Sequence, residues 1–483
     1  MNDLSCRLSA HYLYIFAAII VIPIIGLAQS DPTNYITIRE KAGVTTSQYP
    51  IQIGRPFVPG EIPNFPQAVV NGTSVTTQAD VKSRWADGSV KHAIISFLIP
   101  SLTANSTVTV TFLNQTSGNN AGFLAKADML GTAYDFDATT ALTNGTTTVS
   151  TSARTLLSND KFEYWLKGSV ITSVIVADHS AERTGDIGFD SNKSFRPIFH
   201  ATFWPGINKV RVRFIGEIAN TEALQDQLYS LALKLRSSTP QTVYSKSSVN
   251  HIAASRWTKE FWIGGVPSPI EINHNLAYLV KTKTIPNYDT TRVIPEAALA
   301  EAYTDPYTGW SVVAKDLYDP GNMMKYMAST GGRDEIGPLP TWTVRWLYTG
   351  DKRVADQSFG NAQLSAAFPV HFREGNSTKV FDSAGNPALG RVLSINARPT
   401  VFLNSGNWYI NYSSTTAADK ITAVGAMTDD GWWPDGAHQP DFHSSLYALT
   451  GDYFYLEEMY FWASWGAAYT NPGTDVFWGR GPT

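Results

Sequence analysis

Hydrophobic and polar residues alternate along the first part of the chain. Isoleucine occupies every second position over 36–38 and 51–53, and apolar residues return over 94–99 and at alternate positions over 108–112. A period of two residues is typical of a β-strand with one buried face. Four prolines between residues 56 and 66 interrupt the pattern and exclude a helix in that segment. We therefore predict that the chain begins with a series of β-strands.

A second series of strands follows a connection rich in Gly, Asn and Thr that ends near residue 155. We predict these strands over 162–166, 170–176, 198–204 and 210–218. Valine and arginine alternate over 210–214, so we expect one face of that strand to meet solvent or sugar. The leucine-rich stretch 224–235 is compatible with either a helix or a strand.

Beyond Pro267 the hydrophobic period becomes helical. Helical segments are predicted over 270–281 and 295–303, and two helix pairs follow over about 340–367 and 440–465. Each pair has the sequence Thr-Gly-Asp at its turn. Glycine readily takes the left-handed conformation that ends a helix, and aspartate caps the start of the next helix. The repeat therefore predicts two helix hairpins.

The order of these patterns predicts a multidomain β plus α protein, because 483 residues exceed a usual single domain. We expect a β-barrel or β-sandwich region over 30–250, followed by a partial (α/α) toroid over 251–483 with a β-like insertion at about 372–427. A closed toroid of six helix pairs needs about 300 residues. We therefore expect the toroid to be incomplete and the chain to be truncated at its C-terminus.

The N-terminus has the features of a secretory signal. An apolar run from Leu13 to Leu27 is broken by Pro23, preceded by Arg7 and followed by Ala28. The run is short for a membrane-spanning helix, so we predict a signal peptide over 1–28, with an uncleaved anchor as the alternative. The mature protein is then secreted, periplasmic or on the cell surface, with no stable membrane insertion.

Charge and cysteine content exclude several classes of function. The net charge is −4, which gives no electrostatic basis for binding nucleic acid. A site for an acidic sugar would therefore need its own local arginines. The one cysteine, Cys6, precedes the apolar run, so no thiol remains after cleavage. Disulfides, zinc-thiolate sites and cysteine nucleophiles are thereby excluded.

The clearest turn of the β region reads Trp-Ala-Asp-Gly-Ser-Val-Lys-His over residues 85–92. The Asp87-Gly88 pair suits a tight hairpin turn. This motif and the apolar strand after it resemble the signature of the N-terminal RIFT-type β-barrel in exo-rhamnogalacturonan-lyase-like proteins. In that family a β domain precedes an α/α toroid and a further β domain. This chain has a similar order but is shorter and lacks the last domain, and no catalytic residue of the family is transferred to it.

The resemblance implies a polysaccharide lyase. A lyase acting on a uronate needs groups that neutralise the sugar carboxylate, a base near the C5 proton and an acid at the departing O4. We predict a secreted enzyme that cleaves pectic or rhamnogalacturonan-like polysaccharide by β-elimination, with an acidic polysaccharide or oligosaccharide as its partner and no cofactor.

Four loops contain residues suited to this chemistry. In the first, we predict His274 and Tyr288 as catalytic residues and Asn273, Asn275 and Arg292 as substrate ligands. The alternative for this loop is a capping network at the start of a helix.

The second and third loops supply arginine and histidine. Arg333 lies in a glycine-rich turn and can clamp a carboxylate with two parallel hydrogen bonds, unless it pairs with a neighbouring acid. His371 and Arg373 follow a helix end and are predicted as substrate ligands. Their alternative is simple compensation of the helix dipole.

The fourth loop precedes the second hairpin. We predict catalytic roles for His438 and His443, and substrate binding by Asp435 and by exposed rings of Trp432 and Trp433. His438 lies three residues before Asp441, so we expect these two side chains to face each other. A buried His/Asp network is the alternative. Metal binding is a further alternative, in which His438 and His443 ligate a divalent ion together with Asp435 or Asp441. The spacing does not match a helical zinc site, and no metal is assigned.

Two other functions remain open. A glycoside hydrolase on the same scaffold would use paired carboxylates such as Asp430 and Asp435. A non-catalytic carbohydrate-binding or surface protein would use its aromatic residues without turnover. A serine hydrolase is disfavoured because the sequence has no Gly-x-Ser-x-Gly elbow.

Overall fold

A computed structural model describes residues 32–329, 332–379, 390–403, 416–421 and 431–469. Contacts divide the chain into a short unit, Met1–Thr33, and a second unit, Asn34–Thr483, to which every element below belongs. The predicted signal peptide lies outside the described residues. Within the described segments, no helix has both the length and the hydropathy needed to span a bilayer.

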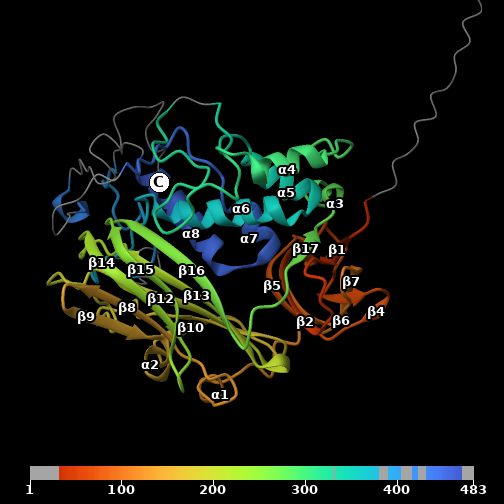
Figure 1. The fold of residues 1–483 in the computed structure, drawn as a ribbon, viewed down its shortest axis with the longest axis horizontal. Coiled ribbons are helices and arrows are strands. Elements are labelled where there is room, and N and C mark those ends of the chain that lie inside the picture. The colour runs from red at the N-terminus through yellow and green to blue at the C-terminus, as the bar shows by residue number, and fades with distance from the viewer. Residues whose placement is uncertain (1–31, 330–331, 380–389, 404–415, 422–430, 470–483) are drawn as a thin grey trace, which may run out of the picture. The chain divides into compact units, whose positions relative to one another are not determined.

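Two antiparallel sheets enclose the N-terminal core (Figure 1). Sheet A has the strand order β17-β1-β7-β3-β4, and sheet B has the order β2-β6-β5. The predicted alternation is confirmed, because Ile36, Ile38, Ile51 and Ile53 are all buried. The strands are β1 (Tyr35–Glu40), β2 (Thr46–Pro56), β3 (Phe65–Val70), β4 (Thr73–Ser74), β5 (Thr77–Arg84), β6 (Val90–Leu102), β7 (Thr107–Gln115) and β17 (Ile270–Asn273).

The hairpin turn over 85–92 is confirmed between β5 and β6. The backbone N–H of Trp85 donates to the carbonyl of Ser89 over 2.8 Å, and Gly88 has a φ of +85°. The indole N–H of Trp85 donates to the carbonyl of Phe57. The tryptophan therefore fixes the turn against the neighbouring chain segment.

One helical prediction is wrong in part. Residues 270–273 form β17, which pairs with β1, and only Leu276–Lys281 is helical. Ile270 and Ile272 pack on the N-terminal core, so the strand that completes sheet A comes from the second half of the chain. The boundary that we place near residue 250 falls in β15, and strands continue to Asn273.

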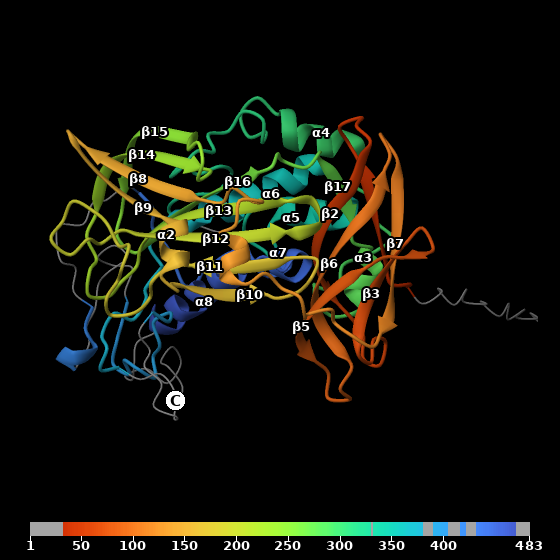
Figure 2. The ribbon, with the colours of Figure 1, turned by 90° about the horizontal axis from the view of Figure 1, so that it is seen from below.

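Sheets C and D form a second β-sandwich around a larger core (Figure 2). Sheet C has the order β15-β14-β8-β9, and sheet D has the order β10-β11-β12-β13-β16. The ambiguous stretch 224–235 is mainly strand. The elements are β8 (Ala138–Asn144), β9 (Thr147–Ser152), β10 (Phe162–Leu166), β11 (Thr172–Val176), β12 (Arg196–Trp204), β13 (Lys209–Ile218), β14 (Gln227–Leu235), β15 (Gln241–His251) and β16 (Ser255–Ile263), with the short helices α1 (Lys126–Met129), α2 (Ala153–Ser158) and η1 (Pro205–Ile207).

Helices α6 and α8 lie on the face of sheet D that points away from sheet C (Figure 1). The described part of the predicted insertion at 372–427 contains the turn η3 and no strand. The helices are α3 (Leu276–Lys281), α4 (Glu296–Thr304), α5 (Thr341–Thr349), α6 (Lys352–Leu364), η2 (Ser365–Ala367), η3 (Ala417–Asp419), α7 (Ser444–Thr450) and α8 (Tyr453–Tyr469).

Both predicted Thr-Gly-Asp hairpins are confirmed. Gly350 ends α5 with a φ of 69°, and Gly451 ends α7 with a φ of 66°. The carboxylates that follow cap the next helices: Asp351 accepts from the N–H of Arg353 over 2.8 Å, and Asp452 accepts from that of Phe454 over 3.1 Å. The repeat is therefore a local signal of helix ends.

The two turns dock on the N-terminal sheets. The α5–α6 turn lies against β17, where a β-carbon on Gly350 would be 2.7 Å from the carbonyl oxygen of Ile272. The α7–α8 turn lies against sheet B, where a β-carbon on Gly451 would be 2.5 Å from Ile94. Glycine at these positions allows the close approach of helix hairpin and sheet.

Candidate functional site

A small polar pocket lies where sheet D, sheet B and the α7–α8 turn meet. Its cavity is about 10 Å³, which is room for one water molecule. A single hydroxyl or carboxylate oxygen fits inside, and the rest of any larger ligand must lie at the mouth. We call this cavity the His200 pocket. It is lined by Gln52, Trp165, Ser173, Ile175, His200, Thr202, Arg211, Arg213, Glu260, Asp452 and Tyr453.

The strand register of sheet D brings the polar residues of the His200 pocket together. His200 of β12 pairs with Arg213 of β13, and Thr202 pairs with Arg211. Residues two apart on a strand share one face, so these four side chains point to the helix side of sheet D. The alternate valines of β13 lie in the sandwich core.

The expectation that this face of β13 meets solvent or sugar is wrong for Arg213. Its side chain is buried under the α7–α8 turn and pairs with Asp452 over 2.9 Å and with Glu260 over 2.8 Å. Arg211 lies nearer the surface, with 23% of its side chain exposed. Arg211 also lies 3.9 Å from Asp452 and 4.0 Å from Glu260. Hence Arg213 holds the turn in place, whereas Arg211 makes longer ion pairs and keeps exposed surface at the mouth.

Gln52 of sheet B joins the three parts of the pocket. Its amide oxygen accepts from Nη2 of Arg211 over 3.2 Å, and its amide nitrogen donates to the carbonyl of Thr450 over 3.1 Å. The indole N–H of Trp165 donates to the carbonyl of Gly451 over 3.1 Å. Figure 2 shows β2 beside the sheet D strands that carry these residues. The N-terminal sheets thus complete the pocket.

His200 is the chemically distinctive residue. It is buried, and neither ring nitrogen has a hydrogen-bond partner within the described part of the chain. Burial lowers the pKa of His200 from 6.5 to about 4, so the imidazole is neutral near pH 7. The ring of Tyr453 lies 5.5 Å from it, and burial raises the pKa of this phenol, which stays protonated. A proton acceptor and a proton donor therefore lie side by side.

The lowered pKa of His200 predicts how the stability of the folded protein depends on pH. The unfolded state takes up a proton below pH 6.5, whereas the folded state does so only below about pH 4. The stabilisation from His200 is thus complete above pH 6.5 and is lost as the pH falls toward 4, by about 3 kcal/mol.

Urea denaturation at several pH values measures this loss. Other buried histidines contribute to the total, so the comparison is with His200→Gln, whose stability must fall less steeply between pH 6.5 and 4. Parallel curves for the two proteins would show that His200 titrates normally in the folded state.

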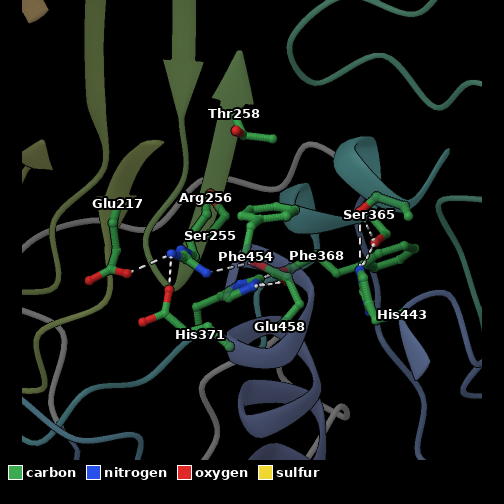
Figure 3. A network of polar contacts seen from close by, with 12 residues as sticks. Glu217, Ser255, Arg256, Thr258, Ser365, Phe368, His371, His443, Phe454 and Glu458 are labelled. Atoms are coloured by element: carbon green, nitrogen blue, oxygen red, sulfur yellow. Dashed lines mark hydrogen bonds and ion pairs between the residues drawn. The ribbon is translucent and has the colours of Figure 1, made fainter. Parts of the chain in front are cut away.

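Below the His200 pocket, charged residues form a buried layer between sheet D and α8 (Figure 3). Arg256 lies 3.1 Å from Glu217 and 2.7 Å from Glu458, and it also contacts Glu457. The guanidinium of Arg256 has no exposed surface. These ion pairs hold α8 on the sheet. We call this set the ionic layer; its members are Glu217, Arg256, His371, Arg373, Glu457 and Glu458.

Two predicted substrate ligands belong to the ionic layer. Arg373 pairs with Glu217 over 2.7 Å and with Glu457 over 2.6 Å, and His371 Nε2 lies 2.8 Å from Glu458. Both side chains are buried. Both side chains therefore contact other residues of the protein and are not exposed to bind substrate.

In the first predicted loop, His274 is buried and Asn273 and Asn275 are half-buried. Burial lowers the pKa of His274 to about 3, and the ring packs 5.8 Å from Trp346. Asn273 donates to the carbonyl of Thr349 over 3.3 Å. Asn275 accepts from the N–H of Tyr278 over 3.3 Å and caps α3, as the structural alternative predicted.

Tyr288 and Arg292 lie apart from the His200 pocket. The ring of Tyr288 is 6.2 Å from that of Tyr348, and burial raises its pKa. Its hydroxyl has no hydrogen-bond partner among the described residues. Arg292 is exposed and pairs with Asp289 over 3.2 Å.

The second and fourth loops meet at the segment 324–327. Arg333 pairs with Glu335 over 3.1 Å and donates to the carbonyl of Met327 over 3.1 Å. The N–H of Met327 in turn donates to the carbonyl of Trp433 over 2.9 Å. Trp432 is buried at 1% exposure, 4.7 Å from Phe368, so the expectation of an exposed ring is wrong for it.

The histidines of the fourth loop have other partners than predicted. His438 contacts Asp435 and does not face Asp441, whose carboxylate accepts from the N–H of Ser444 over 2.9 Å and caps α7. His443 is buried, and its Nε2 lies 3.2 Å from the hydroxyl of Ser365 (Figure 3). Asp430, considered for hydrolysis, lies outside the described residues.

None of the predicted site residues lines the His200 pocket. The residues that do so were missed because their arrangement depends on contacts between distant segments. The arginine alternation of β13 was the one signal in the sequence that pointed to this face. In the described ranges, no group of three or more His, Cys, Asp or Glu side chains could hold a metal ion.

Comparisons of the sequence with protein-family models and with curated proteins found no match. The resemblance carried by residues 85–92 therefore stays a prediction, and function must be argued from the geometry of the site.

Proposed function

We propose that this chain is a carbohydrate-active enzyme that binds acidic saccharides at the His200 pocket and cleaves them by β-elimination. The observation that carries the proposal is His200 itself, a buried neutral histidine with two unpartnered nitrogens that lines a cavity beside Tyr453 and Arg211. Unpartnered polar groups are costly in a protein interior, and their presence favours a functional role.

Each residue has a role in the proposed reaction. Arg211, at the mouth, binds the uronate carboxylate and stabilises the charge that develops on it. His200 accepts the proton from C5, and for this step the pocket must open beyond its volume of about 10 Å³ so that C5 reaches a buried ring nitrogen. Tyr453 donates a proton to O4 as the C4–O4 bond breaks and the C4–C5 double bond forms. At the start of this reaction His200 is neutral and Tyr453 is protonated.

The pocket favours this lyase over a glycoside hydrolase. A hydrolase needs one carboxylic acid that keeps its proton at neutral pH. Both carboxylates in the pocket, Glu260 and Asp452, pair with Arg213. Burial alone would raise the pKa of Asp452, but the guanidiniums of Arg213 and Arg211 outweigh burial and hold the pKa below its usual range. Asp452 is therefore not suited to act as the acid.

The wider predictions are part of the same proposal. The turn over 85–92 supports a RIFT-type barrel at the N-terminus, and the two helix hairpins support a partial (α/α) toroid. An apolar N-terminal run supports export of the protein to the periplasm, cell surface or medium.

An assay of β-elimination tests the proposal. Purified protein is incubated with polygalacturonate and rhamnogalacturonan, and the unsaturated uronate product is followed by its ultraviolet absorbance. We expect His200→Gln to lower turnover by at least about 100-fold, as for loss of a general base. His92→Gln is the control and should keep full activity, because His92 is a partly buried histidine that bonds the carbonyl of Ala448 and does not line the pocket.

Different results would point to different functions. Release of reducing sugar without an absorbing double bond would show that the enzyme is a hydrolase and not a lyase. Binding of these polymers without turnover would leave a carbohydrate-binding protein, a role that the small volume of the cavity also fits. Equal losses of activity in the two histidine variants would show that the His200 pocket is not the active site.

A further inference from the structure

A second cavity, of about 60 Å³, lies at β16, the edge strand of sheet D. This is room for several water molecules. Its walls come from β16, from the α6–η2 segment and from the chain over 310–318. We call it the Trp310 pocket. It is lined by Arg256, Trp257, Thr258, Lys259, Trp310, Lys315, Leu317, Tyr318, Gly360, Gln363, Leu364 and Ala367.

Two lysines give the Trp310 pocket a positive side. Lys315 is exposed, with its ammonium 5.2 Å from the ring centroid of Trp310 and in contact with the Trp310 carbonyl. Lys259 pairs with Asp316 over 3.0 Å, and the same carboxylate is shared with Lys246 and the hydroxyl of Tyr244. Asp316 is thus already paired, no acidic residue in the described part of the chain lines the pocket, and Lys315 is left to bind an incoming anion.

The other walls are aromatic and apolar. Trp310 packs closely on α6 because Gly360 has no β-carbon, which would overlap the indole ring, and only 7% of Trp310 stays exposed. Leu317 and Leu364 line the pocket beside it. An aromatic face next to amide and hydroxyl groups is a common surface for a sugar ring.

Tyr318 has a strained backbone in this pocket. Its φ is +65°, a conformation that bulky residues rarely adopt, and its hydroxyl lies 2.8 Å from that of Ser255. Backbone strain of this kind is concentrated at ligand-binding sites. Tyr318 is therefore held in place at an energetic cost, beside the cavity that it lines.

We propose that the Trp310 pocket is a second binding site, for the carboxylate-bearing sugar unit of an acidic saccharide. The carboxylate binds Lys315, and the sugar ring lies at the mouth of the pocket beside the small part of Trp310 that stays exposed. The two pockets share a wall, because Arg213 of the His200 pocket donates to Thr258 of the Trp310 pocket over 3.5 Å. The identity of the ligand rests on the proposed function, but the site stands on its own contacts.

Lysine footprinting tests this inference on the intact protein. Acetylation of Lys315 is measured by mass spectrometry with trigalacturonate, with neutral galactotriose and without ligand. We expect trigalacturonate alone to slow the reaction at Lys315. Lys167 is the matched control, since it is also exposed and lies over a ring, at 4.6 Å from the centroid of Tyr164, but lines neither pocket. Its acetylation should not change.

Calorimetry with variants gives a second test. Lys315→Gln should weaken trigalacturonate binding about five- to tenfold, as expected for one lost charge-assisted contact, and Lys167→Gln should not. The loss should persist in an Arg211→Gln background. Unchanged affinity and unprotected Lys315 would refute the second site. If Lys315 is protected but no β-elimination occurs, the site stands and the proposed enzyme activity fails.

Discussion

Replacing Glu458 by alanine should lower the free energy of unfolding by about 3 to 5 kcal/mol. Glu458 is completely buried and lies 2.7 Å from Arg256 and 2.8 Å from His371. Its loss leaves the guanidinium with less opposing charge in the interior and opens a cavity beneath α8. Urea denaturation followed by circular dichroism measures the change.

A surface ion pair supplies the control for this prediction. Glu296 pairs with Arg353 over 2.7 Å, but 74% of its side chain is exposed. Glu296→Ala should therefore cost less than about 1 kcal/mol. Similar losses in the two variants would mean that the ionic layer is hydrated and does not hold α8 on the sheet.

Replacing Gly451 by alanine should destabilise the protein by about 3 kcal/mol, through two effects that add. A left-handed alanine costs about 1 kcal/mol, and overpacking of a core costs about 1 to 3 kcal/mol. The new β-carbon would lie 2.5 to 2.8 Å from three carbons of Ile94, which is fully buried in sheet B. The same variant should lose binding at the His200 pocket, because Gly451 positions Asp452 and Tyr453.

A variant at Gly145 separates the backbone cost from the cost of overpacking. It has a φ of 58°, close to that of Gly451, and a β-carbon there would meet no atom within 4 Å. Gly145→Ala should therefore show only the backbone cost of about 1 kcal/mol. Equal melting temperatures for the two alanine variants would contradict the close docking of the α7–α8 turn on sheet B.

The elements that sequence analysis predicted well have local signals. The ends of α5 and α7 follow from glycine and aspartate at adjacent positions, and the turn at 85–92 follows from Asp87-Gly88. Residues 270–273 were assigned to a helix because four residues are too few to define a period. Their strand forms only because β1, remote in sequence, offers an open edge.

The site could not be predicted because its residues have no local signal. His200 lies in an apolar strand and becomes distinctive only through the register of β12 with β13 and the turn that covers them. Sequence alternation correctly shows that β13 has a polar face, but it cannot show what covers that face. In the same way, His371 and Arg373 resemble substrate ligands until Glu217, Glu457 and Glu458 are placed beside them.

The central claim is that acidic saccharides bind at the His200 pocket. A crystal structure of the His200→Gln variant with trigalacturonate tests it most directly, because the variant should bind without turnover. We predict a uronate carboxylate within hydrogen-bonding distance of Arg211, with its sugar ring at the mouth of the pocket. Saccharide bound only at other surfaces, with the His200 pocket closed and empty, would contradict the claim.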